Sequence, residues 1–301
     1  MRTTLRLEKS LRGHSSEPIR SVLSRIAQTS LKVWENIPFR SGLLNQRNPS
    51  GERQSAIDLF ANDIFVRELL KTGHVSEVAS EEMLAPRIGE GTLHIATDPL
   101  DGSSNVETNN PLGSIFGIYD HALPCSGEHL QSAAYVTYGP MLTFTFAMDG
   151  EVNRFVAVRK GSSHVFELLE SNLRMPDSAE VYGFGGLRKD WIPLVQAFVS
   201  DLERRGTRVR YCGTFVGDFN QVLTRGGIFA YPASKTKPRG KLRVLYETAP
   251  MAFIASAAGG YSTSGSQDIL KIEPTDLSET SPAYIGSKSI VRELERALSD
   301  D

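Results

Sequence analysis

A β-hairpin pattern in the middle of the chain constrains its fold most strongly. Over residues 141–148 apolar and polar residues alternate, so every second side chain lies on one face of a strand. Asp149-Gly150 follows, a dipeptide typical of a two-residue hairpin turn, and 152–158 supplies the returning strand. With further strand patterns at 92–97, 114–119 and 132–138, the sequence predicts a strand-rich first half with at least one antiparallel pair.

Two helical patterns precede these strands. Apolar residues follow helical spacing over 15–37, where Pro38 ends the pattern, and again over 55–71, where Gly73 lies just beyond. The polar stretch 41–52 between them is predicted to be a loop.

The second half alternates between the two types of element. Strand patterns at 180–184, 208–212 and 228–232 are interleaved with helical patterns at 188–203, 215–223 and 249–258, and a last helix follows Ser287. Such alternation is typical of a layered α/β protein. A break at 172–178 predicts two domains: 1–175, an α+β domain, and 176–301, an α/β domain.

Composition excludes several classes of protein. A formal net charge of −2 gives no strong field that would favour nucleic acid or an anionic membrane. The chain has no apolar run of about 18 residues. Two cysteines cannot form a disulfide framework, and the six histidines show no zinc-binding spacing. We therefore expect a cytoplasmic protein, although the Arg-rich, acid-poor start leaves a transit peptide open.

One short motif carries most of the chemical information: the run DPLDGSS at 98–104 directly follows a predicted strand. Asp98, Asp101 and the carbonyl of Leu100 offer oxygen ligands of the kind that Mg²⁺ prefers. The next residues offer backbone N–H groups and hydroxyls that can surround a phosphate: Gly102, Ser103 and Ser104. Alone, the motif is also compatible with a polar surface turn.

Four further acidic residues could join this motif. Glu81 and Glu82 are adjacent carboxylates, which repel unless a cation neutralises them, although a solvated loop is the alternative. Asp58 begins the second helix, and Glu247 follows an apolar and basic run at 241–246. Either of these two could instead stabilise a helix N-terminus.

Basic and phenolic side chains complete the candidate site. Lys241 and Arg243 share one side of a predicted strand. Arg210, Tyr211 and Tyr231 offer donors suited to phosphate and sugar hydroxyls. Each alone is more often a surface charge or a tyrosine at the edge of a core.

Together these residues resemble the class 1 fructose-1,6-bisphosphatase family over most of the chain, from about Gly51 onward. The motif at 98–104 is shared more widely, by inositol-phosphatase relatives. The narrower resemblance lies in GGIFAYPA at 226–233, GKLRVLYE at 240–247 and PMA at 250–252. It implies a layered α-β-α-β-α sugar-phosphatase fold with mixed sheets, and Glu52 matches an acidic family position near the metals.

The resemblance also implies an activity in carbohydrate metabolism (gluconeogenesis, or a pentose-phosphate or Calvin-type cycle). A metal-activated water would hydrolyse the 1-phosphate of fructose 1,6-bisphosphate, with two or more Mg²⁺ per subunit or Mn²⁺ in their place. The implied metal ligands are Glu81, Asp98, Leu100, Asp101 and Glu247, and the implied catalytic pair is Asp58 and Glu82. The implied substrate contacts are Asp101, Gly102, Ser103, Ser104, Arg210, Tyr211, Tyr231, Lys241 and Arg243. Arg210 would reach into a neighbouring subunit's site, which requires a homodimer or homotetramer.

The sequence departs from the family pattern in two places. Phe184 and Leu187 stand where the family usually has an asparagine and a tyrosine for the distal phosphate, and neither can donate a side-chain hydrogen bond. Sedoheptulose 1,7-bisphosphate is therefore an alternative substrate. The segment Gly91-Thr92-Leu93 lacks the usual Lys-Tyr of the AMP site, so we expect weak or no inhibition by AMP.

Two other functions are weighed against this one. An inositol-monophosphatase-like enzyme would share the framework, but the run at 241–247 and Tyr231 discriminate against it. A sugar-phosphate sensor without activity would need no water-activating pair such as Asp58 and Glu82.

Overall fold

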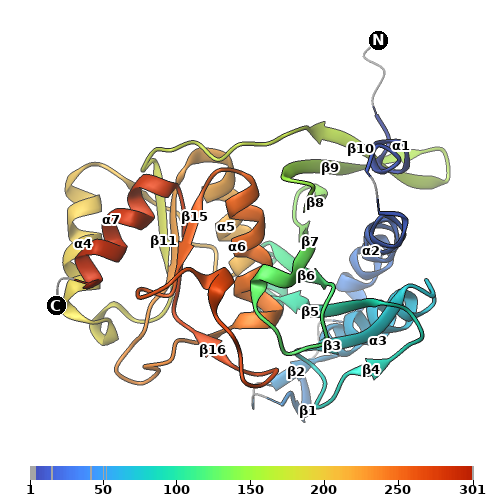
Figure 1. Cartoon of the computed structure of the whole chain (residues 1–301), viewed down its shortest axis with the longest axis horizontal. Coiled ribbons are helices and arrows are strands. Elements are labelled where there is room, and N and C mark those ends of the chain that lie inside the picture. The colour runs from blue at the N-terminus through green and yellow to red at the C-terminus, as the bar shows by residue number, and fades with distance from the viewer. Residues whose placement is uncertain (1–4, 15, 41–42, 50, 52, 300–301) are drawn as a thin grey trace.

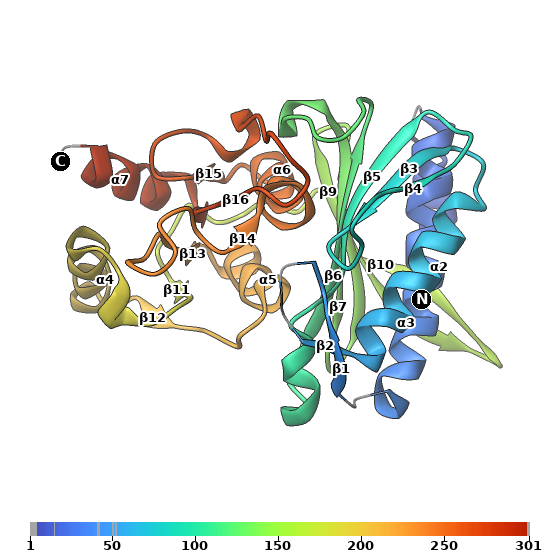
Figure 2. The same ribbon diagram turned by 90° about the horizontal axis from the view of Figure 1, so that it is seen from below.

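A computed structural model of the 301-residue chain describes residues 5–14, 16–40, 43–49, 51 and 53–299. The chain forms five layers in the order helix, sheet, helix, sheet, helix (Figures 1 and 2). From the N-terminal side, the helical layers are α2 (Glu17–Asn36) with α3 (Ala56–Leu70), α5 (Phe215–Arg225) with α6 (Ala249–Ala257), and α4 (Pro193–Arg204) with α7 (Lys288–Ser299). The expected layered α-β-α-β-α fold is thus confirmed.

The first sheet has eight strands, and all neighbours are antiparallel except β3 and β5. Its order is β10 (Ser163–Glu170), β9 (Glu151–Lys160), β8 (Leu142–Met148), β7 (Leu130–Tyr138), β6 (Leu112–Tyr119), β5 (Leu93–Asp101), β3 (Val75–Ser80) and β4 (Arg87–Ile88). The hairpin predicted from the alternation at 141–148 is β8–β9, and its turn has Asp149 and Gly150 at positive φ.

The second sheet has five strands and mixes both directions. Its order is β12 (Arg208–Val209), β11 (Val181–Phe184), β13 (Gly227–Tyr231), β17 (Ala283–Gly286) and β15 (Tyr261–Thr263). Two small pairs lie beside the sheets: β1 (Leu43–Arg47) with β2 (Arg53–Ser55), and β14 (Leu242–Arg243) with β16 (Thr280–Ser281).

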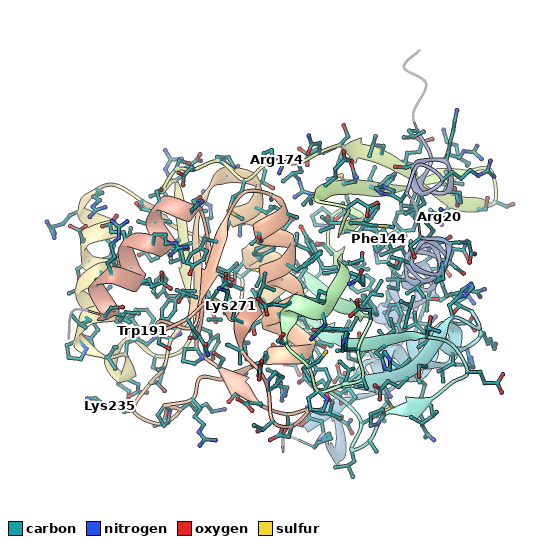
Figure 3. The ribbon with its side chains drawn as sticks, in the orientation of Figure 1. Arg20, Phe144, Arg174, Trp191, Lys235 and Lys271 are labelled. Carbon is teal, nitrogen blue, oxygen red and sulfur yellow. The ribbon has the colours of Figure 1, made fainter. Side chains whose placement is uncertain are left out.

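Three apolar clusters hold the layers together. One joins α2 and α3 to the outer face of the first sheet, and includes Phe144, which lies between β8 and α2 (Figure 3). A second lies around α5 and α6 between the sheets, and a third joins α4 and α7 to the second sheet. The connection between β10 and β11 contains the predicted domain boundary at 175/176. That division stays a prediction, because the apolar cluster around α5 and α6 contains residues from both 1–175 and 176–301.

Several local predictions were wrong. The stretch 41–52 contains β1 rather than being loop throughout, while Ser15, the first residue of the helical pattern over 15–37, and Glu52 lie outside the described residues. The helix predicted over 188–203 begins only at Pro193, a residue whose fixed φ suits the first helical turn. The strand predicted over 208–212 contains only β12, and β10, β15 and β17 were not anticipated. None of the described helices combines the length and apolar character needed to cross a bilayer.

Candidate active site

A polar cavity of about 240 Å³ lies where the end of β5 meets residues from the C-terminal half. It takes its lining from both halves of the chain. Of the candidate residues, all except Arg210 line it: Asp58, Glu81, Glu82, Asp98, Leu100, Asp101, Gly102, Ser103, Ser104, Tyr211, Tyr231, Lys241, Arg243 and Glu247. Residues spread over nearly 190 positions therefore meet around one space.

The pairing of β3 with β5 brings the first acids together. The two strands are parallel, so their carboxyl ends lie side by side, and the N–H of Glu81 donates to the Thr97 carbonyl at 3.1 Å. Asp98 pairs with Ile115 and Asp101 with Gly113, so β5 holds one extra residue there. In a regular strand, residues three apart lie on opposite faces, and this bulge returns both carboxylates to one face. Residues 98–101 are therefore bulged strand and not the polar surface turn with which the motif alone was also compatible.

Glu247 reaches the same point from a different kind of element. The strand predicted over 241–246 is only the short β14, after which the chain forms a π-helical turn at Val244–Thr248. Such turns are often found at functional sites. The carboxylates of Glu81, Asp98 and Glu247 each offer an oxygen within 4.8 Å of the others, and all three side chains are buried.

Arg243 supplies the positive charge in this acidic cluster. One guanidinium nitrogen, Nη1, lies 2.7 Å from Glu81 Oε1 and 3.5 Å from Glu247 Oε2. Glu247 Oε2 also accepts the backbone N–H of Arg243 at 2.7 Å. Buried carboxylates at this spacing need a cation, and Arg243 provides one in this structure.

The carboxyl groups of the β5 bulge hold protons more tightly than usual. Burial raises the pKa of Asp98 well above its ordinary value, and the neighbouring Glu81 raises it further. Loss of hydration raises the pKa of Asp101 to about 7, although the N–H of Val216, 2.7 Å from Asp101 Oδ2, opposes the shift. Asp101 is thereby fixed to the first turn of α5, beside the three clustered acids.

The second candidate pair, Asp58 and Glu82, lies in the same cavity wall. Asp58 forms a capping box at the start of α3, where its Oδ2 accepts the N–H of Ser55 at 2.6 Å. The helix-stabilising role weighed from the sequence is therefore present together with the cavity position. Glu82 accepts a hydrogen bond from Gln54, and burial raises its pKa above the ordinary value, with Asp58 adding to the shift.

The loop after the bulge has the form expected of an anion cradle. Gly102 has φ +77°, and a Cβ there would meet Thr214 Cγ2 at 2.0 Å. Ser103 and Ser104 begin a 3₁₀ turn, Ser103–Thr108. Close packing against the α5 N-terminus, which Thr214 caps with a bond to Gly217 N, leaves room only for glycine.

We expect Gly102→Ala to unfold more easily than wild type by roughly 2–4 kcal/mol, from backbone strain and the clash with Thr214. Gly150→Ala is the matched control, because Gly150 has the same φ of +77° with nothing within 4 Å. It should cost about 1 kcal/mol. Urea unfolding of both variants measures the difference, and equal losses would contradict the close packing inferred here.

The candidate sugar and distal-phosphate residues are placed unevenly. Tyr231 and Lys241 line the cavity together, with Lys241 Nζ 5.9 Å from the Tyr231 ring centroid, and the half-exposed Tyr211 lies at its rim. Arg210 is exposed and lies outside the cavity of its own chain. Its predicted role in a neighbouring subunit's site stays a prediction.

Phe184 and Leu187, the residues that depart from the family's distal-phosphate pattern, lie outside the cavity lining. Phe184 is buried against Trp191, with ring centroids 5.6 Å apart, in the C-terminal half (Figure 3). Leu187 is 61% exposed. The next residue, Arg188, has side-chain donors, but they bond Glu203 at 3.1 Å and Ser200 at 2.7 Å.

Sequence reasoning missed three polar residues of the site. Gln54 orients Glu82, and Asn48 lines the cavity, but both lie in the stretch read as loop or just after it. Asp218 accepts the N–H of Cys212 at 2.7 Å, and burial raises its pKa to about 6. An acid in the first turn of a predicted helix was the available signal, and it is too common to single out a site residue.

The donor set fits a hard divalent cation. Buried carboxylate oxygens converge from three elements, and Arg243 is the cation that lies among them in this structure. Beside them lies a glycine-serine cradle at the N-terminus of α5, a place suited to a phosphate. Fold and site together define the class: a metal-dependent enzyme acting on a phosphate group.

The comparisons identify the family within that class. The family model for the Fructose-1-6-bisphosphatase N-terminal domain matches residues 8–166, and that for the C-terminal domain matches 175–299. A Haloarcula marismortui protein named Fructose-1,6-bisphosphatase class 1 1 is 38% identical over 281 residues, 93% of this chain and 95% of its own. A Geobacter sulfurreducens Fructose-1,6-bisphosphatase class 1 is 39% identical over 295 residues, 95% of this chain and 93% of its own.

Solved structures agree. The holo form of Leishmania major fructose-1,6-bisphosphatase superposes with a TM-score of 0.92 at 28% identity, over 99% of this chain and all of that one. The chain belongs to the class 1 fructose-1,6-bisphosphatase family.

The pKa shifts predict how pH affects the stability of the metal-free protein. Because the folded pKa of Asp101 is about 7, above an unfolded value of about 4, the folded chain binds more protons between these limits. Stability in EDTA should therefore fall as pH rises from about 4 to 7, by roughly 3 kcal/mol from Asp101. A divalent cation that binds the ionised carboxylate should restore the lost stability. The increase in stability caused by Mg²⁺ should therefore grow with pH. Thermal melts at pH 5, 6, 7 and 8 with EDTA or Mg²⁺ test this, and a Mg²⁺ effect independent of pH would contradict it.

Proposed function

We propose that this protein is a Mg²⁺-dependent fructose-1,6-bisphosphatase, which hydrolyses the 1-phosphate of its substrate to give fructose 6-phosphate and phosphate. One observation carries the proposal: three buried carboxylates from separate elements converge beside a glycine-serine cradle in a cavity that also contains Lys241 and two tyrosines. Relatives of that name align over more than 90% of the chain.

Each group of residues has a distinct task. Glu81, Asp98, Asp101 and Glu247, with the Leu100 carbonyl, would hold the divalent cations. When bound, such ions neutralise the phosphate charge and lower the pKa of water. Glu82, with its raised pKa, would take the proton from the attacking water, and Asp58 would orient that water.

The remaining residues would position the substrate. Backbone N–H groups at Gly102–Ser104 would hold the phosphate that is removed, with Arg243 joining them once cations replace it among the carboxylates. Lys241 would contact the sugar, and Tyr211 and Tyr231 the distal phosphate. Arg210 would come from a neighbouring subunit, so the proposal includes a homodimer or homotetramer, and we propose a cytoplasmic location.

A substrate panel tests this function. Steady-state kinetics with Mg²⁺ would compare fructose 1,6-bisphosphate, sedoheptulose 1,7-bisphosphate and inositol 1-phosphate. We expect the highest kcat/KM for fructose 1,6-bisphosphate, and highest activity on inositol 1-phosphate would overturn the proposal.

Sedoheptulose 1,7-bisphosphate is the second candidate substrate. It stays a candidate because the donors that the family usually has for the distal phosphate are missing in this chain. With Phe184 buried against Trp191 and Arg188 bonded to Glu203, the chain lacks two usual family donors. A kcat/KM for the seven-carbon substrate equal to or above that for fructose 1,6-bisphosphate would make it the physiological one.

AMP should inhibit weakly or not at all. The segment Gly91-Thr92-Leu93, just before and at the start of β5, lacks the Lys-Tyr pair of the family's AMP site. Phosphate release measured against AMP up to millimolar concentration should stay near the uninhibited rate. Strong inhibition at micromolar AMP would refute this expectation.

A further inference from the structure

A second group of metal-binding side chains lies on the surface, away from the active-site cavity. It consists of Asp120, His121 and His129, in the connection from β6 to β7. Each residue offers one ligand atom, and these atoms all lie within 4.8 Å of one another. None of the three lines the catalytic cavity.

The backbone holds this group in place before any ion arrives. Asp120 directly follows β6, and its N–H donates to the carbonyl of His129 at 3.2 Å. His129 ends the 3₁₀ turn Gly127–His129, and its own N–H donates to Ser126 at 3.2 Å. Asp120 and His129, nine positions apart in sequence, are therefore joined by a backbone hydrogen bond. Because the loop between them is short and already closed, binding an ion costs little conformational entropy.

The side chains face one another in the manner of a ligand set. Asp120 Oδ1 lies 2.6 Å from Nδ1 of His121 and 3.6 Å from Nδ1 of His129. The two imidazole rings lie against each other, tilted by 33°, with centroids 3.6 Å apart. Ligands 2.0–2.1 Å from a tetrahedral ion lie about 3.4 Å apart, so small side-chain rotations admit the ion.

A fourth residue supports the carboxylate from behind. Gln131 Nε2 donates to Asp120 Oδ2 at 2.8 Å, which leaves Oδ1 turned to the imidazoles. Outer partners of this kind fix the orientation of ligands at metal sites. The three side chains are each 38–58% exposed, so an ion can enter from solvent and keep water as a further ligand.

We propose that Asp120, His121 and His129 form a surface site for a transition-metal ion that accepts imidazole nitrogen, represented by Zn²⁺. Two nitrogen ligands and one oxygen ligand select such an ion over Mg²⁺, which prefers oxygen alone. The bound ion joins the end of β6 to the turn before β7. The site is independent of the phosphatase function.

Zn²⁺ binding measured by equilibrium dialysis in excess Mg²⁺ tests the proposal. Because Zn²⁺ also binds carboxylate oxygens, such as those of the catalytic cavity, the surface site is measured as the difference between wild type and variants that lack one of its imidazoles. Wild type should bind one more Zn²⁺ per chain than His121→Ala or His129→Ala, whose affinity should fall at least about a hundredfold. Gln131→Ala should weaken binding about tenfold.

Two controls separate this site from the rest of the molecule. His164→Ala removes a histidine that packs against Trp34 elsewhere, and should bind Zn²⁺ as wild type does. Glu247→Gln, in the catalytic cavity, should also keep this ion. Equal Zn²⁺ stoichiometry and affinity in wild type, His121→Ala and His129→Ala would overturn the proposal. A thermal melt in EDTA shows that each variant is folded.

Discussion

Asp98→Asn should lower kcat for fructose 1,6-bisphosphate by at least about a thousandfold. The substitution keeps the shape of the side chain but removes one charge from the buried group with Glu81 and Glu247. Losing several kcal/mol of metal-derived stabilisation of the transition state corresponds to a factor of this size. Stopped-time phosphate release with saturating Mg²⁺ measures it.

The same variant should not be less stable without metal. Burial and neighbouring acids already favour the neutral form of Asp98, so a neutral amide relieves repulsion. Urea unfolding in EDTA should give a free energy equal to or above that of wild type. Glu151→Gln, an exposed acid on β9, is the control and should change neither quantity. Activity near wild type in Asp98→Asn would remove this carboxylate from the proposed metal site.

Glu82→Gln should lower kcat by about 10²–10⁴ while leaving the affinity for Mg²⁺ nearly unchanged. That range is typical when a general base is removed. Glu82 lies outside the group of three clustered carboxylates, and its bond with Gln54 directs it within the cavity. Its neighbour provides the comparison, because Glu81→Gln should raise the Mg²⁺ concentration needed for half-maximal rate.

The contrast between adjacent residues makes this prediction sharp. Rate against Mg²⁺ concentration separates the two effects for both variants, and pH profiles report the base. If Glu82→Gln shifted only the Mg²⁺ requirement and Glu81→Gln only the maximal rate, the two roles would have to be exchanged.

The local pattern of apolar residues was sufficient to predict the layered fold, but not to predict every helix and strand. The alternation over 141–148 and the apolar helical faces reflect which side chains must leave water, so the β8–β9 hairpin and α2 were predictable. β1 was not, because its pairing depends on a few backbone bonds, and of the strand predicted over 241–246 only Leu242–Arg243 pairs, with β16 far along the chain. The π-helical turn at Val244–Thr248 has no periodic signature that separates it from a strand end.

For the site, the sequence identified the chemistry but not the geometry. The motif at 98–104 offered oxygen ligand atoms, yet the bulge that puts Asp98 and Asp101 on one face arises from pairing with β6. Likewise, Asp58 was ambiguous between helix cap and site residue, and the structure shows that one carboxylate holds both positions. Gln54 and Asp218 act through contacts that only the folded chain defines.

The surface group at Asp120 illustrates the same limit. Spacing in sequence showed no metal motif among the histidines, whereas the β6–β7 connection places His121 and His129 against each other. Short-range pattern cannot detect ligands that a turn brings together.

Anomalous diffraction from crystals soaked in Mn²⁺ tests the convergence of these acids most directly. We predict peaks about 2.2 Å from carboxylate oxygens of Glu81, Asp98 and Glu247, with the Arg243 guanidinium displaced toward the cradle. Mn²⁺ found only elsewhere, with Arg243 still bonded to Glu81, would show that the cluster is a structural ion-pair network and not a cation site.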